Sequence, residues 1–310
     1  MAGGEALGTL IEQGACRRIE RMPTHAPPNV RLHLRSQPEN ISLVRTTLTG
    51  VAEAIDLLPE VLDDIATAVT EAANNVVLHA YRGDSGPLEV DVYIAAGCIE
   101  VVVRDEGVGL HQTPDYGLED AGESGEQNLE LGLPVIQALA DSVEFHSRAS
   151  GGTEVRMEFV TPETSSLQAT AHDQIDFPLF EQPELITTAT IAITPDRLAR
   201  AVLPRLVCAL AARANFSTDR IYDAQLLADV IAAQAFRSIT GSHLGVGIAV
   251  EPRRVELRVG PLPPGHAAVA VAISSVLGEL APVVGRLADD HSLAPAGPVA
   301  VLALQLIDRR

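Results

Sequence analysis

Aromatic and basic residues are both scarce in this chain of 310 residues. Aromatic side chains make up 3% of the sequence and Trp is absent, so Val, Leu, Ile and Ala must fill any core. Lys and Arg number 22 against 41 Asp and Glu, which gives a formal net charge of -19. Because affinity for nucleic acids and for anionic membranes comes from basic side chains, this balance argues against both as partners. A solvated acidic surface that maintains solubility is the plainer interpretation.

Cysteine is rare, and the chain has no long apolar run. Cys16, Cys98 and Cys208 are far apart and no pair has metal-ligand spacing, which favours a reduced cytosol. The most apolar stretch, 267–278, is shorter than the roughly 20 residues that span a bilayer. Met1 is not followed by a basic flank and an apolar run, so no signal peptide is expected. We therefore expect a cytoplasmic protein with no membrane segment.

The length and the 46% of apolar residues predict two domains with real cores. Residues 1–28 are predicted to be a flexible N-terminal tail, and 163–184, rich in Thr, Ser, Gln and Pro, a linker. The segments 29–162 and 185–310 share one predicted order of elements. In the first, strands are predicted at 30–34, 88–94, 99–104 and 154–160, and helices at 41–54, 59–79 and 133–140. In the second, strands are predicted at 188–193, 245–250, 254–259 and 298–307, and helices at 197–212, 221–238 and 280–288.

An internal match supports the idea that these segments are two copies of one unit. The nine residues 133–141 and the nine residues 281–289 share Pro, Val, Leu, Ala and Asp at matching positions. The same order of elements surrounds both stretches, so we interpret the chain as a tandem repeat. An unrelated second domain is the alternative.

The first segment carries a carboxylate and a carboxamide on one helix face. Glu71 and Asn75 are four residues apart, so they are neighbours on the predicted helix. A carboxylate can take a proton or orient a water, and an amide oxygen suits Mg²⁺. Taken alone, the pattern also fits an ordinary amphipathic helix with a polar outer face.

Three further motifs follow in the same segment. A predicted strand runs into Asp105, Gly107 and Gly109, where the acid can accept a hydrogen bond from an exocyclic amine and the glycines allow close backbone approach. Gly132 opens a helix, and helix N-termini bind phosphate. Thr153 precedes the last strand. Each motif alone also fits a tight turn or a helix start. Their order and spacing in one segment indicate that they belong to one site.

In this order, the four motifs resemble the nucleotide-binding boxes of the GHKL (histidine-kinase-like) ATPases. The stretch from Glu71 to Tyr81 is most similar to the anti-sigma-factor serine/threonine kinases of the RsbW type, and 43–51 is similar to the first helix of that family. The resemblance covers roughly residues 30–160. It implies an α/β fold of the Bergerat type, an α+β two-layer sandwich with a mixed, mostly antiparallel sheet covered by helices on one face.

The resemblance also implies roles for single residues, with ATP and Mg²⁺ as cofactors. Glu71 is expected to be the catalytic base or the water-positioning carboxylate, and Asn75 the Mg²⁺ ligand. Asp105 is expected to bind the adenine amine, with support from Thr153. The other nucleotide-binding residues that it implies are Asn74, Asn75, His79, Gly107, Gly109, Gly132 and Leu133. For His79 a structural role is an equal alternative.

Two departures from the family pattern bear on activity. Glu130 stands where the family has the first glycine of its lid motif, and a carboxylate there would repel a triphosphate. The surrounding stretch 111–130 carries six acidic residues and no Lys or Arg. Because phosphoryl transfer needs cationic stabilisation, this stretch favours ATP binding over fast kinase activity. The acidic stretch also fits a solvated loop that points away from the site.

The second segment keeps the apolar spacing of the first but not its chemistry. At the five matched positions it carries Val230, Gln234, Pro261, Leu280 and Pro298. We therefore expect a degenerate ATPase-like domain without a nucleotide site. Since members of the family act as dimers, the fused copy resembles a built-in second protomer. The expected state is a monomer with an intramolecular pseudo-dimer, or a homodimer.

The leading hypothesis is thus an ATP- and Mg²⁺-binding regulator of transcription that captures a partner protein and phosphorylates a Ser or Thr on it. The partners that the resemblance implies are a sigma factor and an anti-sigma-factor antagonist. One alternative is a catalytically inactive, ATP-binding scaffold. A third hypothesis, the catalytic half of a split histidine kinase, is disfavoured because we find no dimerisation helix with a phospho-acceptor His.

Overall fold

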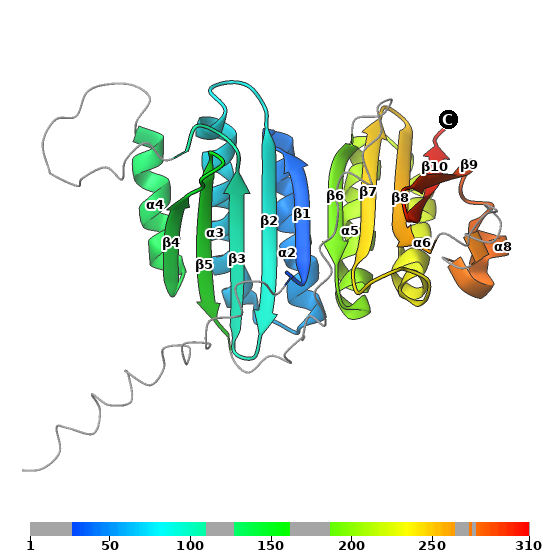
Figure 1. Cartoon of the computed structure of the whole chain (residues 1–310), viewed down its shortest axis with the longest axis horizontal. Coiled ribbons are helices and arrows are strands. Elements are labelled where there is room, and N and C mark those ends of the chain that lie inside the picture. Colours follow the sequence, from blue (N-terminus) through cyan, green and yellow to red (C-terminus); the bar gives the residue numbers. More distant parts are fainter. Residues whose placement is uncertain (1–26, 110–126, 162–186, 264–272, 275–276, 310) are drawn as a thin grey trace, which may run out of the picture.

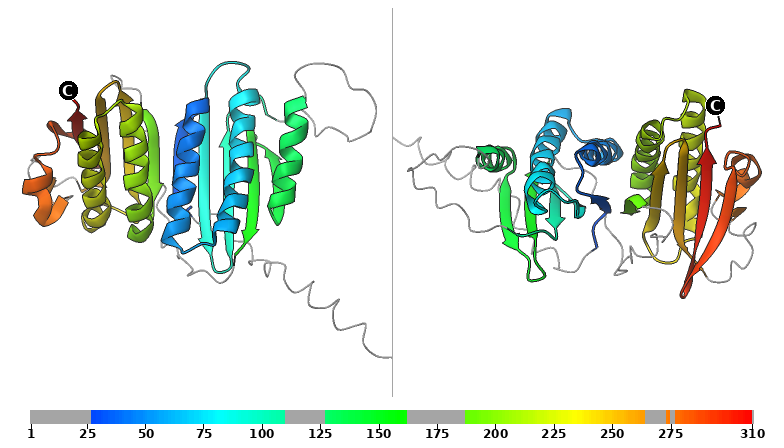
Figure 2. Two further views of the ribbon diagram at one scale, coloured as in Figure 1. Left: turned by 180° about the vertical axis from the view of Figure 1, so that it is seen from behind. Right: turned by 90° about the horizontal axis from the view of Figure 1, so that it is seen from above.

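A computed structural model of the chain contains one continuous sheet of ten strands, with the long helices on one of its faces (Figures 1 and 2). The structure describes residues 27–109, 127–161, 187–263, 273–274 and 277–309. Of the predicted tail, only residues 27 and 28 fall within these ranges, and the predicted linker 163–184 lies outside them.

The first half contains two long helices between its first and second strands, as predicted. In chain order its elements are β1 (Val30–Arg35), η1 (Pro38–Asn40), α2 (Ile41–Ala54), α3 (Pro59–Asn75), η2 (Val76–Ala80), β2 (Pro87–Ala95), β3 (Cys98–Asp105), α4 (Gln127–Leu139), β4 (Ser142–Ser147) and β5 (Thr153–Val160).

The second half follows the same order of strands and helices. Its elements are β6 (Thr187–Ile193), α5 (Asp196–Arg213), α6 (Thr218–Gln234), η4 (Ala235–Arg237), β7 (Leu244–Glu251), β8 (Arg254–Leu262), η5 (Gly278–Leu280), α8 (Ala281–Val284), β9 (Asp290–Ala296) and β10 (Val299–Ile307).

The strand order of the sheet is symmetric about its centre. It runs β4-β5-β3-β2-β1-β6-β7-β8-β10-β9, so each half contributes five strands in mirrored order. Neighbouring strands pair antiparallel throughout, which makes the predicted mixed sheet antiparallel within the described residues. The first strands of the two halves, β1 and β6, therefore lie side by side at the centre.

Backbone hydrogen bonds and apolar packing join the halves along this central seam. The pairing of β1 with β6 runs from Val30 opposite Ile193 to Leu34 opposite Ala189. Val30, Leu32, Ile191 and Ile193 have no exposed surface, and one buried apolar cluster extends through both halves. Full burial of a Val, Leu or Ile side chain, compared with its exposure to water, stabilises the folded state by about 1.5–3 kcal/mol.

Above the seam, α2 of the first half packs against α5 of the second. Gly50 allows a close approach, since a Cβ there would lie 2.8 Å from the Cα of Val202. Polar contacts flank the apolar ones: Arg213 donates to Asn40 Oδ1 at 2.6 Å, and Arg197 pairs with Asp56 at 3.1 Å. The interface therefore combines apolar burial with a close helix contact that needs glycine and with polar pairs at defined positions.

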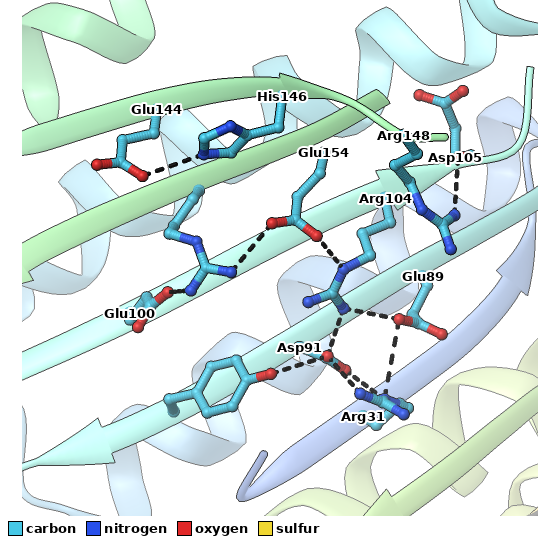
Figure 3. Close-up of polar contacts among 12 residues, drawn as sticks. Arg31, Glu89, Asp91, Glu100, Arg104, Asp105, Glu144, His146, Arg148 and Glu154 are labelled. Carbon is cyan, nitrogen blue, oxygen red and sulfur yellow. Dashed lines mark hydrogen bonds and ion pairs between the residues drawn. The ribbon is translucent and has the colours of Figure 1, made fainter. Parts of the chain in front are cut away.

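The face of the sheet away from the helices carries an ordered array of charges in the first half (Figure 3). Asp91 is completely buried there, and its two carboxylate oxygens accept from Arg31 at 2.7 Å and from Arg104 at 2.5 Å. Arg104 also donates to Glu154 at 2.6 Å. Because every member has an opposite charge beside it, the array tolerates partial burial.

Several predicted elements need correction. The helix predicted for 59–79 ends at Asn75 and passes into the single π-helical turn η2. The helix predicted at 280–288 is shortened to η5 and the four-residue α8, which is followed by Gly285, a residue of low helix propensity. The edge strands β4 and β9 lie outside the predicted strands. In β4 the apolar Val143 and Phe145 alternate with polar residues, whereas β9 begins with three exposed polar residues and contains Pro295.

Within the described residues, no helix combines the length and the apolar character that a membrane span requires.

Candidate functional site

Helix α3 presents Glu71 and Asn75 on its flank, next to α4. Pro59 begins the helix at a position that tolerates the missing N–H, and the stripe formed by Ile65, Ala68, Val69, Ala72 and Ala73 is buried in the core. With this stripe facing the sheet, Glu71 and Asn75 are half-buried on an adjacent flank. The predicted pairing of a carboxylate and a carboxamide one helical turn apart is thus observed.

Gly132 lies directly against this pair. It does not open a helix, as predicted, but lies inside α4, which begins at Gln127. A Cβ at Gly132 would lie 3.3 Å from Asn75 Oδ1 and 3.5 Å from Glu71 Oε2. The structure therefore brings together three of the residues predicted for the site, from two helices that are far apart in the sequence. A side chain at position 132 would fill the space in front of both polar groups.

The π turn η2 continues α3 and ends beside the segment after β3, where the N–H of Val108 donates to the carbonyl oxygen of Ala80 at 3.0 Å. Single π turns inside helices are frequent at functional sites. The Nε2 atom of His79 is buried and has no hydrogen-bond partner within the described residues. Burial also lowers the pKa of this imidazole, so it is neutral near pH 7 and keeps one ring nitrogen as an acceptor.

Asp105, at the end of β3, is the most enclosed acid of the site. Its side chain is 4% exposed, and its Oδ1 accepts from the N–H of Gly107 at 2.8 Å. The N–H and the hydroxyl of Thr153 also donate to its carboxylate. Burial raises the pKa of Asp105, while the hydrogen bonds from Gly107 and Thr153 and the charge of Arg148 oppose that rise.

Glycine is required around Asp105 because neighbouring backbone comes too close for a side chain. A Cβ at Gly107 would lie 2.1 Å from the carbonyl oxygen of Ala80, and a Cβ at Gly152 would lie 2.1 Å from that of Asp105. Gly109 has a φ of +77° and lies over Gly152. The segments around 80, 105–109 and 152–153 thus form one compact wall.

Three further predicted positions have other outcomes. Leu133 packs its side chain partly buried against the apolar core. Asn74 is half-buried on α3 beside Asn75. The side chain of Glu130 and the acidic stretch 110–126 lie outside the described residues, so the hypothesis about the lid stays a prediction.

Two residues of this region were missed as functional candidates. Arg148, in the turn between β4 and β5, donates from Nη1 to the carbonyl oxygen of Asp105 at 3.1 Å (Figure 3). Tyr81 follows η2 and binds the backbone of Glu106. In the sequence, Arg148 is marked only by its place just before Gly151-Gly152, and Tyr81 only by its place in the helix motif.

At the positions that the sequence matches to Glu71 and Asp105, the second half carries apolar residues, while Gln234 at the position matched to Asn75 is polar. Val230 is 4% exposed within the core of α6, and Pro261 lies within β8. Gly278 lies beside Gln234, since a Cβ there would be 3.1 Å from Gln234 Oε1. The alignment of Leu280 with Gly132 stays a prediction, because the side chain of Leu280 lies outside the described residues. The sequence match between 133–141 and 281–289 does not determine how the residues before 281 align with those before 133.

The residues of the first half fit an adenine nucleotide with Mg²⁺. Asp105 offers a buried acceptor for an exocyclic amine, and the glycine-lined wall beside it can admit a flat ring. Asn75 offers one hard oxygen ligand, and among the described residues no group of three or more His, Cys, Asp or Glu is placed to hold a metal. A cation at Asn75 would therefore take its other ligands from phosphate and water, as Mg²⁺ commonly does.

Comparison with known proteins agrees with this geometry. Residues 34–159 match the family described as "Histidine kinase-like ATPase domain". The chain is 30% identical over 142 residues to the serine-protein kinase RsbW of Bacillus pumilus (strain SAFR-032), covering 43% of this chain and 87% of that protein. It is 31% identical over 134 residues to the anti-sigma F factor of Thermoanaerobacter sp. (strain X514), covering 41% of this chain and 90% of that protein.

The fold and these relatives define the class, a histidine-kinase-like ATPase. The chain belongs to the GHKL family, in the branch of the anti-sigma-factor serine kinases typified by RsbW. The family match ends at residue 159, so it covers the half of the chain that carries Glu71, Asn75 and Asp105.

Proposed function

We propose that the first half binds ATP with Mg²⁺ and that the protein acts as an anti-sigma regulator, which captures a partner and phosphorylates a Ser or Thr on it. Its proposed partners are a sigma factor and an anti-sigma-factor antagonist, by analogy with the names of its relatives. The observation that carries the proposal is Asp105, a buried acceptor framed by Gly107 and Thr153.

Each side chain of the site has a distinct proposed task. Asp105 accepts from the adenine amine, and Thr153 fixes the orientation of its carboxylate. Bound Mg²⁺ supplies positive charge to the phosphates. Asn75 holds that cation through Oδ1, while Glu71, one helical turn earlier, orients the attacking hydroxyl or accepts its proton.

The transfer activity is tested with γ-labelled ATP, Mg²⁺ and a candidate antagonist protein. Acid-stable label on the antagonist supports a Ser/Thr kinase, and acid-labile label would instead indicate a histidine kinase. Bound ATP without any transfer would favour the second candidate, an inactive ATP-binding scaffold. The acidic stretch 111–130, which has no Lys or Arg, is the feature that favours that second candidate.

Glu71→Ala and Asn75→Ala should separate transfer from metal-dependent binding. Glu71→Ala should leave the affinity for ATP within about twofold of wild type and abolish label transfer, because a base contributes roughly 10²–10⁴ to the rate. Asn75→Ala should remove the difference between ATP affinities measured with Mg²⁺ and with EDTA. Transfer at the wild-type rate in Glu71→Ala would exclude this carboxylate from the mechanism.

The preference for ATP over ITP should fall at acid pH. ITP lacks the exocyclic amine, so the ratio of ATP affinity to ITP affinity reports on the contact with Asp105. Protonation of the triphosphate affects both affinities alike and does not change the ratio. Burial raises the pKa of Asp105 above its ordinary 3.8, so the ratio should be constant at neutral pH. The ratio should decrease as the pH falls through the raised pKa of Asp105. A protonated carboxyl group no longer offers a negatively charged acceptor to the adenine amine. A ratio that stays constant as the pH is lowered through that raised value would show that Asp105 does not face the base.

The second half is proposed to be a degenerate copy of the same unit, comprising 185–310 against 29–162 for the first. Support comes from the shared order of elements and from the mirrored strand order of the sheet. In this arrangement the second half takes the position of a second protomer against β1 and α2, and it contributes no nucleotide site. The expected solution state is a monomer with an internal pseudo-dimer.

A further inference from the structure

A single hydroxyl group connects three segments of the chain behind the wall of the site. Tyr81 Oη donates to the carbonyl oxygen of Pro87 at 2.5 Å and accepts from the N–H of Glu106 at 2.9 Å. Tyr81 itself ends the π turn, Pro87 begins β2, and Glu106 follows Asp105 directly. The hydroxyl thus uses both its donor and its acceptor capacity on backbone groups.

The ring of Tyr81 is held in place by the backbone that it covers. A Cβ at Gly86 would lie 2.1 Å from the ring, so the ring lies flat against a position that only glycine can occupy. Burial raises the pKa of the Tyr81 hydroxyl, so it keeps its proton for the bond to Pro87 at physiological pH. The side chain therefore has little freedom to leave this position.

The position of Asp105 depends on the peptide that Tyr81 binds. From one side Tyr81 holds the Glu106 N–H, and from the other Arg148 donates to the Asp105 carbonyl at 3.1 Å. Both bonds act on the same peptide unit, the one that joins Asp105 to Glu106. Gly107, the residue after Glu106, donates to Asp105 Oδ1, so the carboxylate is tied to the same short loop that Tyr81 holds.

We propose that Tyr81 is a positioning residue for base recognition, which acts through the Asp105–Glu106 peptide and sets the preference for an amine-bearing purine. The inference rests on the proposed function, because it concerns how Asp105 meets adenine. Without the Tyr81 hydroxyl, the Glu106 N–H and the Pro87 carbonyl lose their partner, and the loop that carries Asp105 moves relative to the base.

The test compares the affinities of full-length wild type and Tyr81→Phe for ATP and for ITP in Mg²⁺. The ratio of ATP to ITP affinity should fall roughly two- to tenfold in Tyr81→Phe. This is the change in affinity that corresponds to the free energy of one hydrogen bond. Tyr93→Phe is the matched control, since the Tyr93 hydroxyl donates to Asp91 Oδ2 at 3.2 Å on the charged face of the sheet. It should lose comparable stability and keep the wild-type ratio.

The outcomes separate this inference from the function on which it rests. A wild type that prefers ATP and a Tyr81→Phe variant with the same preference would overturn the role of Tyr81 alone. A wild type with no preference for ATP over ITP would overturn the assignment of Asp105 as well. Amide exchange on the wild type gives a readout that needs no variant: the Glu106 N–H should be protected, and exchange at the rate of an exposed loop amide would contradict the proposal.

Discussion

Asp105→Asn should weaken the binding of ATP to the full-length protein by roughly 10- to 150-fold. The substitution replaces a charged acceptor with one carboxamide oxygen, and its amide group turns a donor toward the donors of Gly107 or Thr153. Losing a hydrogen bond to a charged group costs about 1.5–3 kcal/mol, which corresponds to this range of affinity. Competition against a fluorescent ATP analogue in Mg²⁺ measures the change.

Asp141→Asn is the control for this substitution. Asp141 is an exposed acid whose Oδ2 accepts from the N–H of Val160 at 2.7 Å, so the variant loses the same formal charge outside the site. Its affinity for ATP should equal that of wild type. If Asp105→Asn binds ATP as tightly as Asp141→Asn does, the base does not lie against Asp105.

Cleaving the chain within the linker, at about residue 175, should make the first half self-associate or lose stability. Separating the two fragments after the cut removes β6 from β1 and α5 from α2. This leaves one edge of β1 unpaired, next to the apolar residues Val30 and Leu32. Such edges and apolar faces promote association. Sedimentation and thermal melting of the separated fragment measure both outcomes.

A substitution in the intact chain tests the same interface. Gly50→Leu should destabilise the protein by about 1–3 kcal/mol, because even a Cβ there would lie 2.8 Å from the backbone of Val202. Thr49→Ala, at the exposed neighbouring position, should have little effect, since its hydroxyl binds only Arg45 of its own helix. A separated first half that stays monomeric and keeps its melting temperature would show that the halves are independent modules.

Local patterns predicted much of the fold, because the elements concerned bury one regular face. Helix α2, the body of α3 and the β2–β3 hairpin follow from apolar spacing and from a Gly turn at Gly97. The edge strands β4 and β9 were not predicted: β4 carries a short alternation of Val143 and Phe145 with polar residues, but β9 has no such pattern. The pairing of β1 with β6 is a contact between distant segments, and a local pattern does not specify which edges will meet.

The site shows the same division between local and distant information. The motifs placed Glu71 and Asn75 on one helix flank and Asp105 at a strand end, because both arrangements depend on spacing alone. The roles of Tyr81 and Arg148 were missed, since each acts on a backbone group of another segment. The register that puts Gly278 beside Gln234 likewise depends on packing of α6 and not on the sequence match.

Titration of the intact protein with Mg²⁺-ATP in a calorimeter tests the central claim most directly. We expect one ATP per chain, because the second half carries Val230 and Pro261 at the positions matched to Glu71 and Asp105. This binding should be weakened in Asp105→Asn. Two ATP per chain would show that the second half has kept a site. No binding at millimolar ATP would contradict the assignment of the first half as a nucleotide site.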